Sequence, residues 1–148
     1  MARSYYSAVL DEPAGMVWSV IRDFGNYALW VDGVDDARIE DERPGDAVGA
    51  VRSVRMGETR IRQKLLAHSD RECSYTYKFC EPCRFPVCDY VATIRVTPIV
   101  DGNRAFVEWW ATFDVAVEDR DHWTEFFARS FATWLGLLRR GLAGEALR

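Results

Sequence analysis

The order of apolar and polar positions divides the chain into three regions. The first begins with Ser4 to Leu10, whose alternation predicts a strand. The segment "DEPAGMVWSVIRDF" then changes to helical spacing, with Asp11 as the expected N-cap and Pro13 in the first turn. "GNYALWV" predicts a second, briefer helix that ends at Gly33. The chain therefore starts with one strand and two short helices.

The middle region repeats with a period of two, which is typical of strands. Short turn sequences separate its apolar runs, and Asp101-Gly102 is the strongest hairpin signal among them. Sequential antiparallel strands need only short connections, so we expect one antiparallel sheet. The predicted strands are Asp36 to Glu42, Val48 to Met56, Thr59 to His68, Cys73 to Cys80, Asp89 to Thr97 and Arg104 to Val117.

The last region, from about Asp121 to Leu142, returns to helical spacing. A helix of about twenty residues is roughly 30 Å long, enough to cross a sheet. One helix is too narrow to cover a whole face of such a sheet, so a curved sheet around it should leave an apolar space for a small molecule. The apolar stripe consists of Trp123, Phe127, Phe131, Leu135, Leu138 and Leu142.

Composition narrows the class of protein. The chain has 148 residues, the size of one domain, and we expect residues 1–148 to form a single ligand-binding domain. Six Trp, six Tyr and eight Phe are more aromatic residues than packing alone requires, which favours a lined cavity. A net charge of −4 argues against binding nucleic acid or an anionic membrane.

The sequence indicates no secretion or membrane insertion. "MARSYYSAVL" lacks the apolar core of a signal peptide, and no run approaches the roughly 20 apolar residues of a spanning helix. We therefore expect a soluble cytoplasmic protein, without stable membrane insertion, that is a monomer or homodimer. A basic run from Arg52 to Lys64 is the local exception to the acidic charge. Because Arg60, Arg62 and Lys64 alternate, the first interpretation is a solvated face, and phosphate binding is the alternative.

Several spaced segments resemble one family over nearly the whole chain. The sequence is similar to the SRPBCC superfamily of helix-grip proteins, and within it to the polyketide cyclase/dehydrase-like branch. The resemblance implies an α+β fold with a curved antiparallel sheet of six or seven strands around a long C-terminal helix, two short helices after the first strand, and an internal cavity. The segments are "VWSVIRDFGNYALWVDGV", "VGAVRSVRM", "RQKLLAHSD", "SYTYKF", "FPVCDYVATIRVTP" and "VEWWATFDV".

Strand alternation assigns side chains to faces independently of the resemblance. The last strand is ambiguous, because both of its faces carry aromatic residues. Its two candidate inward sets are Phe106, Glu108, Trp110 and Thr112, or Val107, Trp109, Ala111 and Phe113. On the other strands the inward sets are Cys73, Tyr75, Tyr77 and Phe79, then Ile61, Gln63, Leu65 and Ala67, and Tyr90, Ala92, Ile94 and Val96.

The resemblance resolves the ambiguity in favour of an inward Glu108, and it also implies an inward Arg52. These two residues would form an ion pair across the cavity, with Tyr90 and Gln63 as hydrogen-bond partners. Arg52, Glu108 and Tyr90 are therefore the candidate catalytic residues. The candidate ligand-binding residues are Val54, Met56, Ile61, Gln63, Tyr75, Tyr77, Phe79, Ala92, Trp110, Phe127, Phe131 and Leu135.

Two interpretations of this cluster compete. In one, Arg52 holds a carbonyl or enolate while Glu108 or a tyrosine moves a proton, as aldol cyclisation and dehydration require. In the other, the cluster only orients strands or lines a pocket. We expect binding of a hydrophobic, aromatic or polyketide-like molecule without a cofactor. The alternatives are a polyketide cyclase, aromatase or dehydrase, and a lipid or quinone chaperone or protein-interaction module.

The stretch "CEPCRFPVC" places Cys80, Cys83 and Cys88 around one turn. Zinc needs about four converging ligands, and this spacing supplies three. A zinc site, a redox pair of Cys80 and Cys83, and incidental thiols at the rim of a pocket are the alternatives, and the last is preferred. No metal site is therefore expected. The serines, histidines and glycines show neither a nucleophilic triad nor a phosphate loop.

Overall fold

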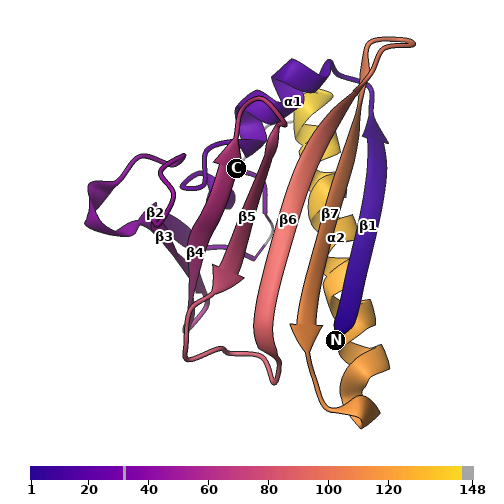
Figure 1. Cartoon of the computed structure of the whole chain (residues 1–148). Coiled ribbons are helices and arrows are strands. Elements are labelled where there is room, and N and C mark those ends of the chain that lie inside the picture. The colour runs from indigo at the N-terminus through magenta and orange to yellow at the C-terminus, as the bar shows by residue number, and fades with distance from the viewer. Residues whose placement is uncertain (32, 145–148) are drawn as a thin grey trace.

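A seven-stranded antiparallel sheet and a long C-terminal helix dominate the fold of residues 1–31 and 33–144, which the computed structural model describes (Figure 1). The strand order is β1-β7-β6-β5-β4-β3-β2, so the first and last strands pair and all the other neighbours are sequential. The strands are β1 (Ala2–Leu10), β2 (Asp36–Ile39), β3 (Val51–Met56), β4 (Thr59–Ser69), β5 (Ser74–Phe79), β6 (Cys88–Ile99) and β7 (Arg104–Asp114).

The two short helices after β1 and the long C-terminal helix lie where the sequence pattern predicts, whereas two further short 3₁₀ helices, η2 (Glu40–Glu42) and η3 (Val117–Asp119), were not predicted. The predicted helices are α1 (Ala14–Ile21), the short 3₁₀ helix η1 (Tyr27–Leu29) and α2 (Arg120–Leu142). The curved antiparallel sheet around a long terminal helix confirms the predicted helix-grip class, and α1 with η1 supplies the two short helices. No helix in the described part of the chain is long and apolar enough to span a membrane.

Some predicted boundaries are wrong. The strand predicted from Asp36 to Glu42 ends at Ile39, because Asp41 and Glu42 have positive φ angles of 60° and 53°, which extended strands do not allow. The expected N-cap Asp11 is also displaced, since α1 begins directly after Pro13. A proline fits there because the first helical turn needs no donor from it.

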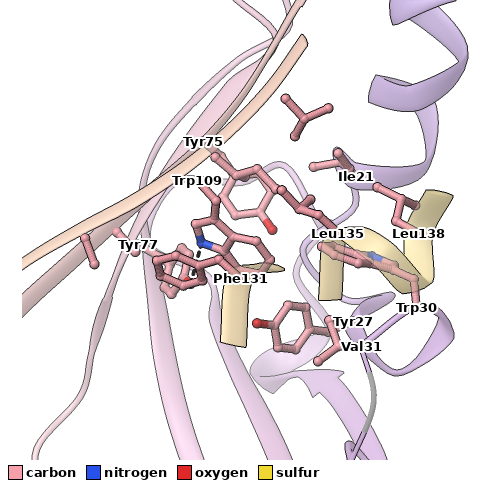
Figure 2. Close-up of a cluster of buried hydrophobic side chains, with 14 of the residues drawn as sticks. Ile21, Tyr27, Trp30, Val31, Tyr75, Tyr77, Trp109, Phe131, Leu135 and Leu138 are labelled. Carbon is pink, nitrogen blue, oxygen red and sulfur yellow. Dashed lines mark hydrogen bonds between the residues drawn. The ribbon is translucent and has the colours of Figure 1, made fainter. Parts of the chain in front are cut away.

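The helix α2 packs on β1 and β7, which form one half of the sheet. Its buried stripe consists of Phe127, Phe131, Leu135 and Leu138. At the centre of this core, the fully buried Trp109 of β7 stacks on Phe131 with ring centroids 4.6 Å apart and planes 13° apart (Figure 2). The other half of the sheet, β2 to β4, packs against α2 far less.

The predicted inward face of β7 is wrong. Its buried residues are Val107, Trp109, Ala111 and Phe113, each at most 1% exposed. Glu108 and Trp110 therefore lie on the outer face, where Glu108 accepts a 2.7 Å hydrogen bond from the hydroxyl of Tyr5. Both faces of this strand carry large apolar residues, so only the packing of α2 against β1 and β7 decides which face is buried.

Candidate functional site

A small pocket of about 80 Å³ lies between α2 and the half of the sheet that α2 leaves uncovered. Strands β3 to β6 supply one wall, α2 the other, and η1 and the β5–β6 loop contribute one aromatic ring each. Ligand pockets are usually about 300–1,000 Å³, so this pocket can enclose only part of a ligand. Its lining consists of Tyr27, Val54, Met56, Ile61, Gln63, Tyr77, Phe79, Phe85, Tyr90, Phe126, Phe127, Ser130 and Trp134.

Many of the predicted ligand-binding residues line this pocket. They are Val54, Met56, Ile61, Gln63, Tyr77, Phe79 and Phe127, and the candidate catalytic residue Tyr90 joins them. Alternation on β4, β5 and β6 had assigned Ile61, Gln63, Tyr77, Phe79 and Tyr90 to the inward face of the sheet. Their part in binding or catalysis stays a prediction.

The remaining predicted residues lie elsewhere. Tyr75, Ala92, Phe131 and Leu135 are buried in the core beside the pocket and do not line it. Trp110 and Glu108 are on the outer face of the sheet, so the predicted ion pair between Glu108 and Arg52 does not form. Arg52 is fully buried behind Gln63.

Sequence reasoning missed five lining residues. Phe126 and Trp134 flank the predicted apolar stripe of α2, and Ser130 lies between them on the helix surface. Helical spacing already puts these two aromatic residues at the edge of the apolar stripe, and this is the signal that could have identified them as lining residues. Tyr27 comes from the predicted second short helix and Phe85 from the cysteine-containing loop, and no periodicity shows where such segments point.

Arg52 and Gln63 are direct neighbours on β3 and β4, and their side chains meet behind the pocket. The Nε of Arg52 donates to Oε1 of Gln63 at 2.8 Å, and Nη2 donates to the same oxygen. Nη1 donates to the backbone carbonyl of Phe24 at 3.3 Å. No carboxylate pairs with Arg52 within residues 1–31 and 33–144.

Aromatic rings surround the guanidinium of Arg52 in place of a carboxylate. Its central carbon is 3.9 Å from the ring centroid of Phe24, 3.8 Å from that of Tyr27 and 5.2 Å from that of Tyr77. A buried charge is costly unless it is compensated, and the negative faces of aromatic rings compensate part of it. The back wall of the pocket is therefore electropositive.

Three tyrosines, Tyr27, Tyr77 and Tyr90, bring hydroxyl groups to the pocket. Burial raises the pKa of Tyr77 to about 12, and the nearby charge of Arg52 opposes this rise. Burial likewise raises the pKa of Tyr27 and of Tyr90 well above the ordinary value of 10.0. The hydroxyl of Tyr77 also accepts a 3.3 Å hydrogen bond from Nε1 of Trp109. These groups are neutral near pH 7, so they serve as hydrogen-bond partners and not as bases.

The cysteines of the β5–β6 loop are free thiols, and burial raises the pKa of Cys83. Their sulfur atoms do not gather as metal ligands would. Within the described residues, the potential ligand atoms that lie within 4.8 Å of one another belong instead to Asp46, His68 and Asp70. A zinc site in the cysteine loop therefore has no geometric support.

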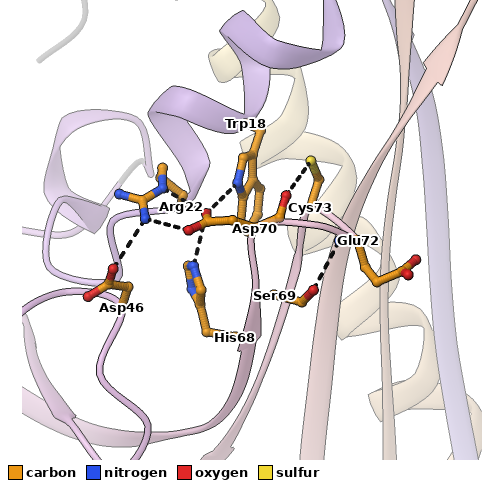
Figure 3. Close-up of polar contacts among 8 residues, drawn as sticks. All are labelled: Trp18, Arg22, Asp46, His68, Ser69, Asp70, Glu72 and Cys73. Atoms are coloured by element: carbon orange, nitrogen blue, oxygen red, sulfur yellow. Dashed lines mark hydrogen bonds and ion pairs between the residues drawn. The ribbon is translucent and has the colours of Figure 1, made fainter.

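The side chains of Asp46, His68 and Asp70 form an ion-pair cluster with Arg22, away from the pocket (Figure 3). Nη2 of Arg22 lies 3.2 Å from Asp46 and 2.9 Å from Asp70, and Nε1 of Trp18 donates to Asp70 at 2.9 Å. The bonds from Arg22 hold the pKa of Asp70 well below its usual range. Arg22 occupies the space between the carboxylates, so the cluster fastens the end of α1 to the turn after β4.

The sequence over residues 1–144 matches the family described as "Polyketide cyclase / dehydrase and lipid transport". The chain belongs to this family. This membership confirms the resemblance to the polyketide cyclase/dehydrase-like branch of the SRPBCC superfamily. A search among curated proteins gives no match.

Solved structures of this polyketide cyclase/dehydrase fold are similar over almost their full length. A solution structure of a protein from Thermobifida fusca has a TM-score of 0.86 at 24% identity, covering 100% of this chain and 98% of that one. The protein XoxI from Bacillus cereus has a TM-score of 0.85 at 23% identity, covering 97% of each chain. A protein from Nitrosospira multiformis has a TM-score of 0.79 at 24% identity, again covering 97% of each. At these identities the likeness concerns the fold.

Proposed function

We propose that this protein binds a hydrophobic small molecule in the pocket between α2 and strands β3 to β6. The observation that carries the proposal is the lining itself: aliphatic and aromatic side chains enclose it, with a few polar groups at the back. Mostly apolar pockets with a few placed polar groups are typical ligand sites. Membership of a family that includes lipid transport supports the same class of ligand.

The geometry supports a slender ligand that extends outward. An outer recess of about 220 Å³ is lined by Phe126, Arg129, Ser130, Thr133 and Trp134. Phe126, Ser130 and Trp134 also line the inner pocket, so the two spaces meet along one face of α2. A chain or a narrow ring edge would occupy the inner pocket, and a larger part would lie in the recess beside Arg129.

Binding has better support than cyclase or dehydrase chemistry. Proton abstraction needs a base, and the expected base Glu108 lies on the outer face of the sheet. None of the residues lining the described pocket carries a carboxylate or an imidazole, and the tyrosines there have raised pKa values. If the protein were an enzyme, Tyr90 would be the candidate proton donor to a substrate in the pocket. Gln63 would then stand between that substrate and Arg52.

A slender fluorescent fatty acid, cis-parinaric acid, tests the proposal by titration. Ile61→Trp should fill the inner pocket and weaken binding about tenfold or more, whereas Leu66→Trp, at an exposed position of the same strand, should bind like the wild type. Native mass spectrometry of protein from its own host should show a co-purifying mass that Ile61→Trp lacks. Absence of saturable binding to the wild type, or unchanged binding to Ile61→Trp, would contradict the proposal.

A further inference from the structure

The hydrogen bonds from Arg52 decide which atom of the Gln63 side-chain amide faces the guanidinium. A guanidinium has only N–H donors and no acceptor, so the atom of Gln63 that faces it must be the carbonyl oxygen. Two N–H groups of Arg52 donate to that oxygen, one from Nε at 2.8 Å and one from Nη2. The NH₂ group of Gln63 is therefore turned away from Arg52.

This NH₂ group has no protein acceptor. Gln63 is 6% exposed, and the described residues provide no hydrogen bond to its Nε2. Nε2 is also not one of the fully enclosed polar atoms that lack a partner. The space that Gln63 borders is the inner pocket. An accepting ligand atom in the pocket would satisfy this donor.

Arg52 is held firmly enough to keep this donor in place. It is fully buried, its guanidinium lies against the rings of Phe24 and Tyr27, and Nη1 donates to the carbonyl of Phe24. Its charge also polarises the amide through the carbonyl oxygen, which makes the opposite N–H bonds stronger donors. The same charge disfavours a cationic group at the inner end of the pocket.

We propose that Gln63 is the specificity-determining residue of the pocket and that Arg52 is its positioning residue. The ligand carries a hydrogen-bond-accepting oxygen, such as a ketone or ester carbonyl, at the end that enters first. A purely hydrocarbon end binds more weakly, and an ammonium group is rejected. This inference rests on the proposed binding function, and it adds the chemical class of the buried end.

A pair of probes with the same shape tests this inference. In 2-nonanone a carbonyl oxygen occupies the place of the methylidene carbon of 2-methyl-1-nonene. Wild-type protein should bind the ketone about tenfold more tightly by titration followed with nuclear magnetic resonance. The side-chain NH₂ signal of Gln63 should move on adding the ketone and stay in place with the alkene.

Gln63→Glu is the informative variant, because a carboxylate still accepts from Arg52 but cannot donate to the ligand. It should bind both probes alike, whereas Lys64→Gln, which makes the same change of net charge at the exposed next position of β4, should keep the preference for the ketone. Equal binding of the two probes to the wild type, an unmoved Gln63 signal, or a ketone preference retained in Gln63→Glu would overturn the inference. If both probes bind equally, only the role of Gln63 fails; if neither binds, the proposed pocket function fails with it.

Discussion

The two halves of the sheet have interiors of different chemistry. Under α2, the half formed by β1 and β7 buries mostly aromatic and aliphatic residues and no charge, with Trp109 stacked on Phe131. Its buried polar residue, Ser4, donates a hydrogen bond to the carbonyl of Thr124 in α2. Across the molecule, β3 and β4 bury Arg52 and Gln63 beside a pocket. The width of a single helix accounts for the difference, because the buried guanidinium and the pocket occur where the helix no longer covers the sheet.

We therefore expect the covered half to contribute mainly to stability and the uncovered half to contain the binding site. In the covered half, stacked rings such as Trp109 on Phe131 serve packing. Within residues 1–31 and 33–144, the guanidinium in the uncovered half has no carboxylate partner and the NH₂ group of Gln63 has no acceptor. Natural cores leave few such groups unsatisfied, and those that remain require an explanation. A bound ligand would satisfy the amide in this case.

The largest expected effect tests which face of β7 is buried. Trp109→Ala should lower the free energy of unfolding by about 3–5 kcal/mol, because it empties the centre of the covered half. Trp110→Ala, one residue later on the outer face, should cost much less. Urea denaturation measures both. Equal losses would mean that the assignment of faces on β7 is wrong.

The next effect concerns alkaline pH. The pKa of Tyr77 rises from 10.0 to about 12 in the folded state, which corresponds to about 3 kcal/mol. Between these values the unfolded chain loses a proton that the folded chain keeps, so this stability is present below pH 10 and is lost as the pH rises through 12. Urea denaturation at each pH, with tyrosinate absorbance, should show this slope weakened in Tyr77→Phe. Ionisation of every tyrosine at its ordinary pKa before unfolding would contradict it.

A smaller loss of stability is expected when Arg52 loses its hydrogen-bond acceptor on Gln63. Gln63→Leu removes the oxygen that two N–H groups share and should cost about 1.5–3 kcal/mol of unfolding free energy. Gln63→Glu supplies an acceptor again and should stay close to the wild type. Thermal and urea denaturation compare the two variants. If Gln63→Leu were as stable as Gln63→Glu, the buried guanidinium would not depend on this contact.

The smallest effect concerns the ion-pair cluster outside both halves. The lowered pKa of Asp70 stabilises the fold at pH values above 3.8, and this contribution is lost as the pH falls through the folded-state pKa. The cluster is largely exposed, so Asp70→Asn should lower the melting temperature only slightly and flatten its dependence on acid pH. Asp101→Asn, in the β6–β7 turn, is the matched control. A steeper acid dependence in Asp70→Asn would contradict this account.

Periodicity predicted most of the fold and one wall of the pocket. The stripe through Phe127 and Phe131 identified the buried face of α2, and alternation identified Tyr77 as an inward residue. The short turn at Gly57 implied the pairing of β3 with β4 that makes Arg52 and Gln63 neighbours.

The remaining features depend on information that local patterns lack. Alternation could not place Glu108, because aromatic residues lie on both faces of β7 and tertiary packing chooses between them, and the inward position that the resemblance implied is wrong. Phe85 belongs to an irregular loop whose direction follows from contacts with residues distant in sequence, among them Phe127. The free donor of Gln63 follows from the position of a neighbouring charge, which a single strand does not reveal.

One titration tests the central claim most directly: that a ligand enters between α2 and the uncovered half of the sheet. The six tryptophan indole N–H signals report on different places, since Trp134 lines the pocket and Trp110 lies on the outer face of β7. On adding 2-nonanone, the account predicts saturable movement of the Trp134 signal while that of Trp110 stays in place. Movement of Trp110 with an unmoved Trp134 would contradict it.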